Sequence, residues 1–481
     1  MLAKSANRHP EKIATETVSF SLTYQQLHQQ VIKASAYLAA VGLQPGDKVM
    51  LFLPNSIEFI VSVFAIARLG GIVVPVNTAL EITELTLYLT DSGAKFIILN
   101  QDSLVRCGKL IKKSANSCQL VTDMLTTPIA NPAATVAATP ATPVLYQYTS
   151  GSSGQQKRIV KTHANLLYEA KHYTTTIELT ESDRILTVVP MHHAHGFGNC
   201  LLAGIYSGAR LVILENFSRA IVMEMLLRQS ITVFPGVPFM FSILADSTVI
   251  PDTPLSHLRL AFTAGAPLTE KIFTTCKRKF SIGLRQLYGS TETGSISINR
   301  GAVSGKLWAS VGQPIEGVKV KIVTSKGHVA DNNESGEIAV SSAAAISEYA
   351  GLAELNRRVF REGYFFTGDL GYTDKHGNLF ITGRKTLFIN VGGNKVDPVE
   401  IETVLNQHPD IVESVVLGVP GAYGDEMIKA VIASRKTISA ESVKQWCQDK
   451  LASFKLPRKI EFCEKIPRSP LGKVLRKDLL G

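Results

Sequence analysis

Apolar strands that alternate with amphipathic helices constrain the fold of this chain more than any other feature. Residues 23–43 carry apolar side chains at helical spacing, and Gly42 and Pro45 end that pattern. An apolar strand at 48–54, an apolar helix at 56–69 and a second strand at 72–75 are predicted next. Since these strands are apolar throughout, both faces of their sheet are expected to be covered. The sequence therefore predicts an α/β fold built on parallel sheets.

The same alternation recurs along the chain and suggests its organisation. Further apolar strands are predicted at 95–99, 210–214 and 258–263, which predicts two α/β subdomains. From about residue 312 the chain changes to short strands, such as 319–323 and 336–340, separated by Gly, Asp and Asn turns. We expect these strands to form a small β-barrel.

Residues 385–481 are predicted to form a small, compact α+β domain. They contain helical patterns at 398–406 and 439–451 and strand patterns at 411–418 and 428–433. The expected organisation is therefore an N-terminal domain at 1–384 and a C-terminal domain at 385–481. The Thr-, Pro- and Ala-rich stretch at 126–143 is interpreted as a loop without chemistry of its own.

Composition narrows the class of protein. The 481 residues are 45% hydrophobic and 19% charged, as in ordinary folded chains. The six cysteines lie far apart without zinc-binding spacing and are interpreted as reduced thiols. No signal peptide or long apolar segment is present, so we expect a cytoplasmic protein with no transmembrane segment. The net charge of +10 lacks an accompanying RNA-binding or zinc-finger motif, and no nucleic-acid partner is predicted.

A Gly- and Ser-rich segment between Tyr148 and Lys157 follows the predicted strand at 144–146. Small residues let backbone N–H groups wrap phosphate oxygens, and the lysine neutralises their charge. The spacing is not that of a Walker A loop. A plain turn is the alternative interpretation of this segment alone.

Four segments together resemble the adenylate-forming superfamily of acyl-CoA synthetases, luciferases and peptide-synthetase adenylation domains. They are the phosphate loop above, residues 287–293 (Leu-Tyr-Gly-Ser-Thr-Glu-Thr), residues 364–371 with Gly383 and Arg384, and residues 467–476. The resemblance runs from residue 22 to residue 477, with the motifs in family order. It implies an N-terminal region of two α/β subdomains plus a small barrel, joined to a mobile C-terminal domain.

The resemblance also implies roles for single residues. Tyr288 would stack on adenine beside Gly289, Thr291 would contact the α-phosphate, and Glu292 would bind Mg²⁺. Asp369 would accept both ribose hydroxyls, because a carboxylate accepts several hydrogen bonds. Arg384 would lie at the domain junction and Lys473 would be the lysine required for adenylation. The implied phosphate-binding residues are Thr149, Ser150, Gly151, Ser152, Ser153, Gly154 and Lys157.

The segment from Pro190 to Gly196 resembles the family segment beside the acyl pocket, with His193 at the usual position. Three histidines, at 192, 193 and 195, also suggest a metal site, but adjacent side chains point in different directions and no carboxylate follows. Zinc is therefore not favoured. Other implied pocket residues are apolar or small, namely Phe197, Val237, Phe239, Ala264, Gly265 and Ala266.

The activity implied is ATP-dependent conversion of a carboxylic acid to acyl-AMP, followed by transfer to the thiol of CoA. Gly392 and Gly393 would approach the pantetheine arm after the C-terminal domain rotates. No aspartate stands near Ala194 to pair with an amino group, so a fatty or aryl acid is expected and an α-amino acid is not. ATP, Mg²⁺ and CoA are the implied cofactors.

Three alternatives stay open. The acceptor thiol could belong to the phosphopantetheine of an acyl carrier protein, which would then be a partner. A non-catalytic nucleotide-binding homologue is the second, because Gln156, Arg158, Thr386 and Leu387 depart from the family pattern in the phosphate loop and at the hinge. An oxygen-using luciferase shares most of the same motifs.

Overall fold

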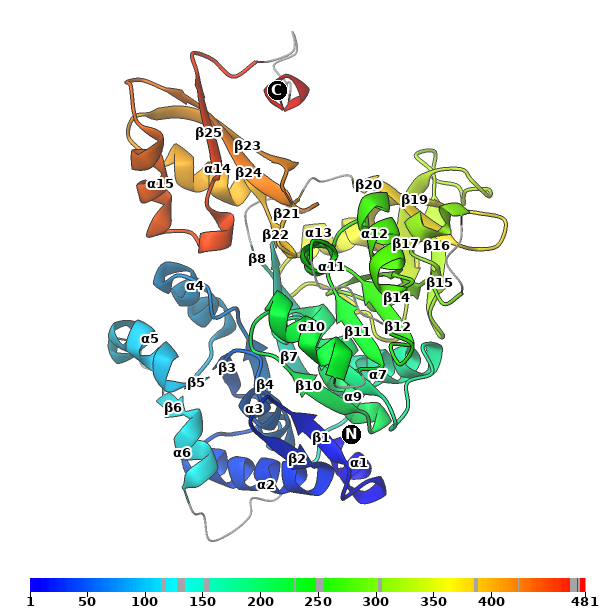
Figure 1. Cartoon of the computed structure of the whole chain (residues 1–481). Helices are drawn as coiled ribbons and strands as arrows, with labels where there is room; N and C mark the ends of the chain where they lie inside the picture. Colours follow the sequence, from blue (N-terminus) through cyan, green and yellow to red (C-terminus); the bar gives the residue numbers. More distant parts are fainter. Residues whose placement is uncertain are drawn as a thin grey trace. The chain divides into compact units, whose positions relative to one another are not determined.

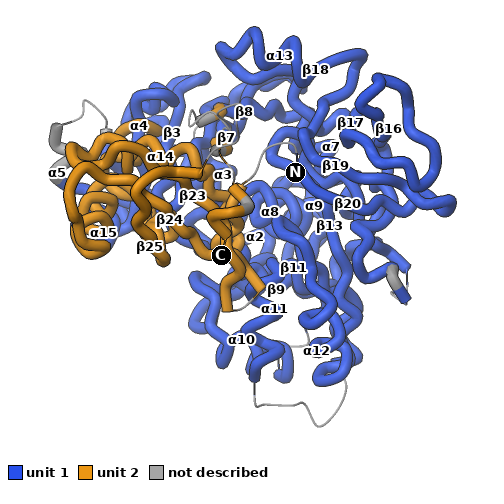
Figure 2. The backbone as a smooth tube through the Cα atoms, turned by 90° about the horizontal axis from the view of Figure 1, so that it is seen from above, with its two compact units in different colours: residues 1–78, 89–147, 158–384 blue, residues 79–88, 148–157, 385–481 orange. Residues whose placement is uncertain are grey.

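The computed structural model describes residues 1–113, 117–127, 135–150, 156–228, 231–247, 255–301, 305–384, 388–422, 424–467, 474 and 476–480. The chain divides into two compact units, coloured separately in Figure 2. The first unit consists of residues 1–78, 89–147 and 158–384. The second unit contains residues 385–481 together with two short segments, 79–88 and 148–157.

The larger sheet of the first unit has nine strands (Figure 1). Its neighbours from β13 to β1 run parallel, and antiparallel strands complete both edges. The strand order is β15 (Gln313–Pro314), β14 (Gly294–Ile298), β13 (Arg285–Ser290), β12 (Leu260–Thr263), β11 (Val233–Gly236), β9 (Arg184–Thr187), β10 (Arg210–Ile213), β1 (Ile13–Glu16) and β2 (Ser21–Thr23).

Helices cover both faces of this sheet, as Figure 1 shows. Successive strand residues alternate between two cores: Leu211 lies in one hydrophobic cluster, and its neighbour Val212 lies in the other. The first cluster includes side chains of α7 (His163–Thr176) and α9 (Ala203–Ser207). The second includes side chains of α10 (Arg219–Arg228), α11 (Pro238–Ala245) and α12 (Glu270–Phe280).

A second sheet has six strands, in the order β6 (Ser117–Leu120), β5 (Phe96–Leu99), β3 (Lys48–Phe52), β4 (Ile72–Pro75), β7 (Pro143–Ser150) and β8 (Gln156–Thr162). The pairs from β6 to β7 are parallel. Helix α3 (Ile57–Arg68) lies between β3 and β4 in sequence, and its N-cap Ser56 accepts a hydrogen bond from Phe59 N. A capping box at Thr23 starts α2 (Tyr24–Ala40) in the same way.

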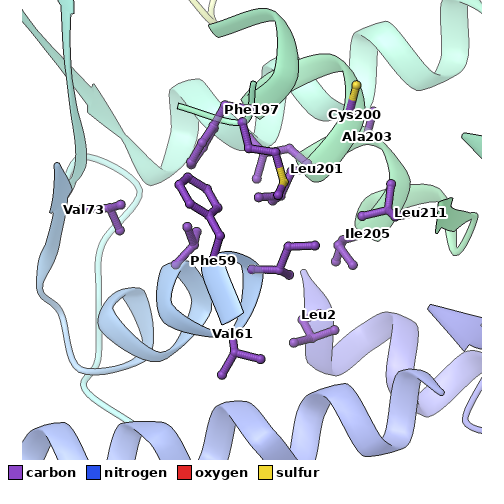
Figure 3. Close-up of a cluster of buried hydrophobic side chains, with 14 of the residues drawn as sticks. Leu2, Phe59, Val61, Val73, Phe197, Cys200, Leu201, Ala203, Ile205 and Leu211 are labelled. Carbon is purple, nitrogen blue, oxygen red and sulfur yellow. The ribbon is translucent and has the colours of Figure 1, made fainter. Parts of the chain in front are cut away.

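One hydrophobic core joins elements of both sheets. Figure 3 shows part of it, with Phe59 of α3, Leu211 of β10, and Phe197 and Leu201 of the π-helix Phe197–Leu202. These four side chains are almost completely buried. Because cavities in such a core are costly, the shared packing holds the two sheets of this unit together.

The predicted barrel is a curled antiparallel sheet of five strands: β16 (Lys319–Val323), β17 (Gly336–Ser341), β19 (Tyr364–Thr373), β18 (Phe360–Arg361) and β20 (Leu379–Arg384). A separate cluster that includes Tyr288 and Ile338 forms its core. Helix α13 (Ala353–Val359) precedes β18.

The second unit contains an α+β fold. Strands β23 (Ile411–Pro420), β24 (Glu426–Ser434) and β25 (Lys459–Cys463) form a sheet, and the hairpin β21–β22 (Ile389–Val391 and Asn394–Val396) precedes it. Residues of α14 (Pro398–Asn406) and α15 (Ala440–Gln448) share a core with these strands. The predicted α/β class, with parallel sheets, a curled sheet and an α+β C-terminal part, is confirmed.

The structure corrects the bounds of several predicted strands: the one expected at 48–54 ends at Phe52, and the one expected at 210–214 ends at Ile213. The strand expected at 258–263 begins only at Leu260, because Leu258 and Arg259 donate their N–H groups to local turns. The Arg259 side chain instead binds Asp183 at 2.7 Å. Within the described residues, none of the helices is both long enough and apolar enough to cross a membrane. All six cysteines carry free thiols.

Candidate active site

The hairpin between β13 and β14 presents the predicted metal and phosphate ligands. Its register shifts between Tyr288 and Gly289, and Gly294 adopts φ +71°. A Cβ added at Gly289 would lie 2.7 Å from Gly294 O, so the two strands approach closely here. Ser290 Oγ accepts a 3.2 Å hydrogen bond from Thr293 N and closes the turn. Thr291 and Glu292 therefore stand at the tip of a well-fixed hairpin.

In the first unit, Asp369 contacts both Tyr288 and Arg384. The Tyr288 hydroxyl donates to Asp369 Oδ2 at 2.6 Å, and Arg384 Nε lies 3.4 Å from Asp369 Oδ1. Asp369 and Arg384 are register partners on β19 and β20. Burial, followed by the Asp369 charge, raises the pKa of Tyr288 well above its ordinary value, so the phenol stays a donor at neutral pH.

Glu292 has a partner that the sequence did not indicate. Tyr349 Oη donates to Glu292 Oε1 at 2.7 Å, and Ile346 N donates to the Glu292 carbonyl at 2.9 Å. Burial, followed by the Glu292 charge, raises the pKa of Tyr349 far above its ordinary value. No local sequence signal marks this pair, because its members lie 57 residues apart.

A buried ion pair packs against Gly294 of this hairpin. Lys161 Nζ lies 3.3 Å from Glu169 Oε2, and the two side chains are only 2% and 7% exposed. The Glu169 carboxylate packs against two glycines: a Cβ at Gly198 would lie 2.2 Å from Oε1, and one at Gly294 would lie 2.7 Å from Cδ. Both positions must therefore stay glycine while Glu169 holds this place.

The histidine segment forms part of a buried hydrogen-bond chain. His195 Nε2 lies 3.2 Å from Gly236 O, its Nδ1 lies 2.9 Å from Asn199 Nδ2, and Asn199 Oδ1 accepts from Ser295 Oγ at 2.8 Å. Burial lowers the pKa of His195 to about 4, so the ring is neutral at physiological pH. Both ring nitrogens of His195 are therefore engaged in structural hydrogen bonds. Asn199 lies on the π-helix, a type of element that is frequent at functional sites.

Two family models match most of the chain. The family model for AMP-binding enzymes matches residues 2–350, and the model for the C-terminal domain of AMP-binding enzymes matches residues 400–473. The chain belongs to the AMP-binding enzyme family. The predicted membership of the adenylate-forming enzymes is confirmed.

Two curated relatives of this AMP-binding enzyme span nearly its whole length. Oxalate–CoA ligase of Arabidopsis thaliana is 29% identical, covering 99% of this chain and 96% of its own. Long-chain-fatty-acid–CoA ligase FadD13 of Mycobacterium tuberculosis is 30% identical, covering 95% and 92%. A solved structure of an o-succinylbenzoate CoA synthetase double mutant from Bacillus subtilis, bound to a product analogue, superposes with a TM-score of 0.91 at 27% identity, covering 99% and 97%.

The donor set of this AMP-binding enzyme fits Mg²⁺ held mainly by substrate. The described residues contain no group of three or more His, Cys, Asp or Glu side chains able to hold a metal ion, so the three histidines form no such site. Glu292 offers one carboxylate, and Mg²⁺ commonly binds one or two carboxylates together with substrate phosphates. The residues therefore suit a metal ion that arrives with ATP.

The remaining predicted site residues lie in several places. Gly265 (φ +87°) and Ala266 follow β12 in the first unit. Thr149, Lys157, Gly392 and Gly393 belong to the second unit, the two glycines forming the β21–β22 turn with φ of 55° and 90°. Gly151, Ser152, Ser153, Gly154, Thr386, Leu387 and Lys473 lie outside the described residues, as does the side chain of Ser150.

Proposed function

We propose that this AMP-binding enzyme is an acid–CoA ligase, which activates a carboxylic acid with ATP and transfers the acyl group to the thiol of CoA. The observation that carries the proposal is the cluster of Tyr288, Asp369 and Arg384 in the same unit as the Glu292 hairpin. A carboxylate beside a buried aromatic ring suits a nucleoside, and a second carboxylate suits a phosphate-bound cation.

In the first step, a carboxylate oxygen of the acid attacks the α-phosphorus and the bond to pyrophosphate breaks. Asp369 holds the ribose hydroxyls, and Thr291 donates to the α-phosphate as negative charge develops. Lys473 is proposed to supply a positive charge that lowers the repulsion between the two reacting anions. When bound through Glu292, Mg²⁺ supplies positive charge that stabilises the phosphates.

In the second step, the CoA thiolate attacks the acyl carbonyl, and AMP leaves with the bonding electron pair. Gly392 and Gly393 lack side chains, which suits close passage of the pantetheine arm. His193 lies in the segment proposed to border the acyl pocket. The two reactions then share one site, which adds a proximity effect.

The acid is proposed to be a fatty or aryl acid. Phe197, Val237 and Ala264 are buried, and Phe239 is partly buried in the same cluster as Val237. We propose that these apolar side chains border the space for an alkyl or aryl group. The named relatives use acids as different as oxalate and long-chain fatty acids, so chain length requires measurement.

The test is a pyrophosphate-release assay with ATP and Mg²⁺ over a panel of dicarboxylic, fatty and aryl acids, with and without CoA. Release with one acid class and formation of its acyl-CoA are expected, and Lys473→Ala should abolish release. Lys465→Ala, an exposed lysine near the end of the chain, is the matched control.

Two other outcomes would replace the proposal. Acyl-AMP that accumulates and ignores CoA, but reacts with an acyl carrier protein, would establish a carrier-protein ligase. Absence of release with every acid, while ATP still binds, would indicate a non-catalytic homologue.

A further inference from the structure

Tyr349 is a buried phenol directed at the carboxylate that is proposed to bind Mg²⁺. It is 3% exposed, and its hydroxyl donates to Glu292 Oε1 at 2.7 Å. Among the described residues, no hydrogen bond or ion pair engages the other oxygen, Oε2. The ring packs edge-to-face against Phe360 and Phe365, at centroid distances of 5.7 and 6.4 Å. The phenol therefore has little freedom to leave its acceptor.

The backbone of Tyr349 is fixed by Asn356. Tyr349 N donates to Asn356 Oδ1, and Asn356 Nδ2 donates to Tyr349 O, both at 2.8 Å. This reciprocal pair joins the first turns of α13 to the segment that carries the phenol. An amide that both donates and accepts in this way fixes the backbone in direction as well as in position.

The segment that precedes Tyr349, residues 343–346, is hydrogen-bonded to α7 and to β8. Lys161 Nζ donates to Ala344 O at 3.0 Å, and Asn165 Nδ2 donates at 3.0 Å to each of the carbonyls of Ala343 and Ala345. Ile346 N then donates to Glu292 O. Glu292 is thus held through its main chain and its side chain by one immobilised segment.

We infer that Tyr349 is a positioning residue for the Glu292 carboxylate: it occupies Oε1 and leaves Oε2 to the metal ion that accompanies ATP. The inference rests on the proposed function. Partners that hydrogen-bond a metal-binding carboxylate fix its orientation, and their loss typically weakens metal affinity by about 10–100-fold. The alternative is that the Tyr349 side chain has only a packing role in the core beside β19.

The experiment compares Tyr349→Phe with wild type by calorimetric titration of ATP, once with Mg²⁺ and once with EDTA. We expect Mg·ATP to bind about tenfold more weakly to the variant, with unchanged affinity for metal-free ATP. The same titration with Mn²⁺ and ATP should show the same selective loss. Tyr168→Phe, which is 43% exposed and stacks on His172, is the matched control and should change neither affinity.

A double-mutant cycle with Glu292→Gln separates positioning from packing. If Tyr349 acts through the carboxylate, Tyr349→Phe should have no further effect on Mg·ATP affinity in the Glu292→Gln background. Asn356→Ala should give a smaller, equally metal-selective loss, which provides a second route should Tyr349→Phe fold poorly.

The possible failures are distinguishable. Equal losses with and without Mg²⁺, or a full loss in the Glu292→Gln background, would overturn the positioning role while the proposed function stands. Wild-type ATP affinity that does not depend on Mg²⁺ would also overturn the positioning role, whereas the proposed function fails only if no acid gives pyrophosphate release.

Discussion

Tyr288 and Asp369 lie 81 residues apart in sequence, yet the phenol donates a 2.6 Å hydrogen bond to the carboxylate. With Arg384 on the other oxygen, the carboxylate is held in one orientation, and its further lone pairs can accept the ribose hydroxyls. Asp369→Asn removes the charge of the acceptor, and hydrogen bonds to charged groups contribute about 1.5–3 kcal/mol. AMP binding measured by calorimetry should weaken about 10–100-fold. The exposed Asp331→Asn is the control, and an unchanged affinity in Asp369→Asn would reject the ribose role.

The ion pair of Lys161 and Glu169 provides a stability test. Both side chains are buried, so Lys161→Met leaves an uncompensated carboxylate and should lower the free energy of unfolding by about 3–5 kcal/mol. Adding Glu169→Gln should recover part of the loss, because the buried charge is then removed. Urea denaturation followed by circular dichroism measures both changes. Lys326→Met, at an exposed turn, is the control, and a loss no larger than in that variant would contradict the assignment.

Gly196 tests the backbone of the histidine segment. A Cβ at this position would lie 2.3 Å from Pro190 O, a backbone atom that cannot rotate away. Gly196→Ala should therefore destabilise the protein by about 1–3 kcal/mol, as overpacking does. Gly108→Ala on α5 (Gln101–Lys113) is the matched control, since its Cβ would meet nothing within 4 Å. Differential scanning calorimetry should show a lower Tm for Gly196→Ala alone, and equal Tm values would show that the segment relaxes freely.

The lowered pKa of His195 should cause part of the pH dependence of the free energy of unfolding. Its pKa is lowered from 6.5 to about 4 by burial, so the unfolded chain binds a proton at this residue below pH 6.5 while the folded chain does not. This contribution to stability is complete above pH 6.5 and is lost as pH falls toward 4. Between pH 7.5 and 5.0 the loss amounts to about 2 kcal/mol.

His195→Gln removes that titration. The difference in free energy of unfolding between pH 7.5 and 5.0 should shrink by about this amount in the variant, although the variant is less stable at both values. The exposed His376→Gln controls for loss of a histidine. The same pH difference in His195→Gln and wild type would show that the pKa of His195 does not differ between the folded and unfolded chain.

Local patterns in the sequence predicted most helices and strands and indicated residues for the candidate site. Continuous apolar runs predicted β3 and β4 because strands buried on both faces need no polar side chains. Thr23 and Ser56, the first residues of two predicted helices, are the N-caps of α2 and α3 and accept backbone hydrogen bonds. Tyr288, Glu292 and Asp369 were recognisable because each lies in a short family motif.

Which buried polar groups meet became clear only from the three-dimensional structure. Tyr349 reaches Glu292, and Asn199 reaches Ser295, across 57 and 96 residues, and neither pair has a local pattern. One local prediction was wrong as well: the helix expected at 439–451 spans only Ala440–Gln448. Periodicity reports which face of an element is buried, but the partner of a buried polar group depends on how distant elements pack. Because an unpaired buried polar group is costly, that packing had to bring these partners together.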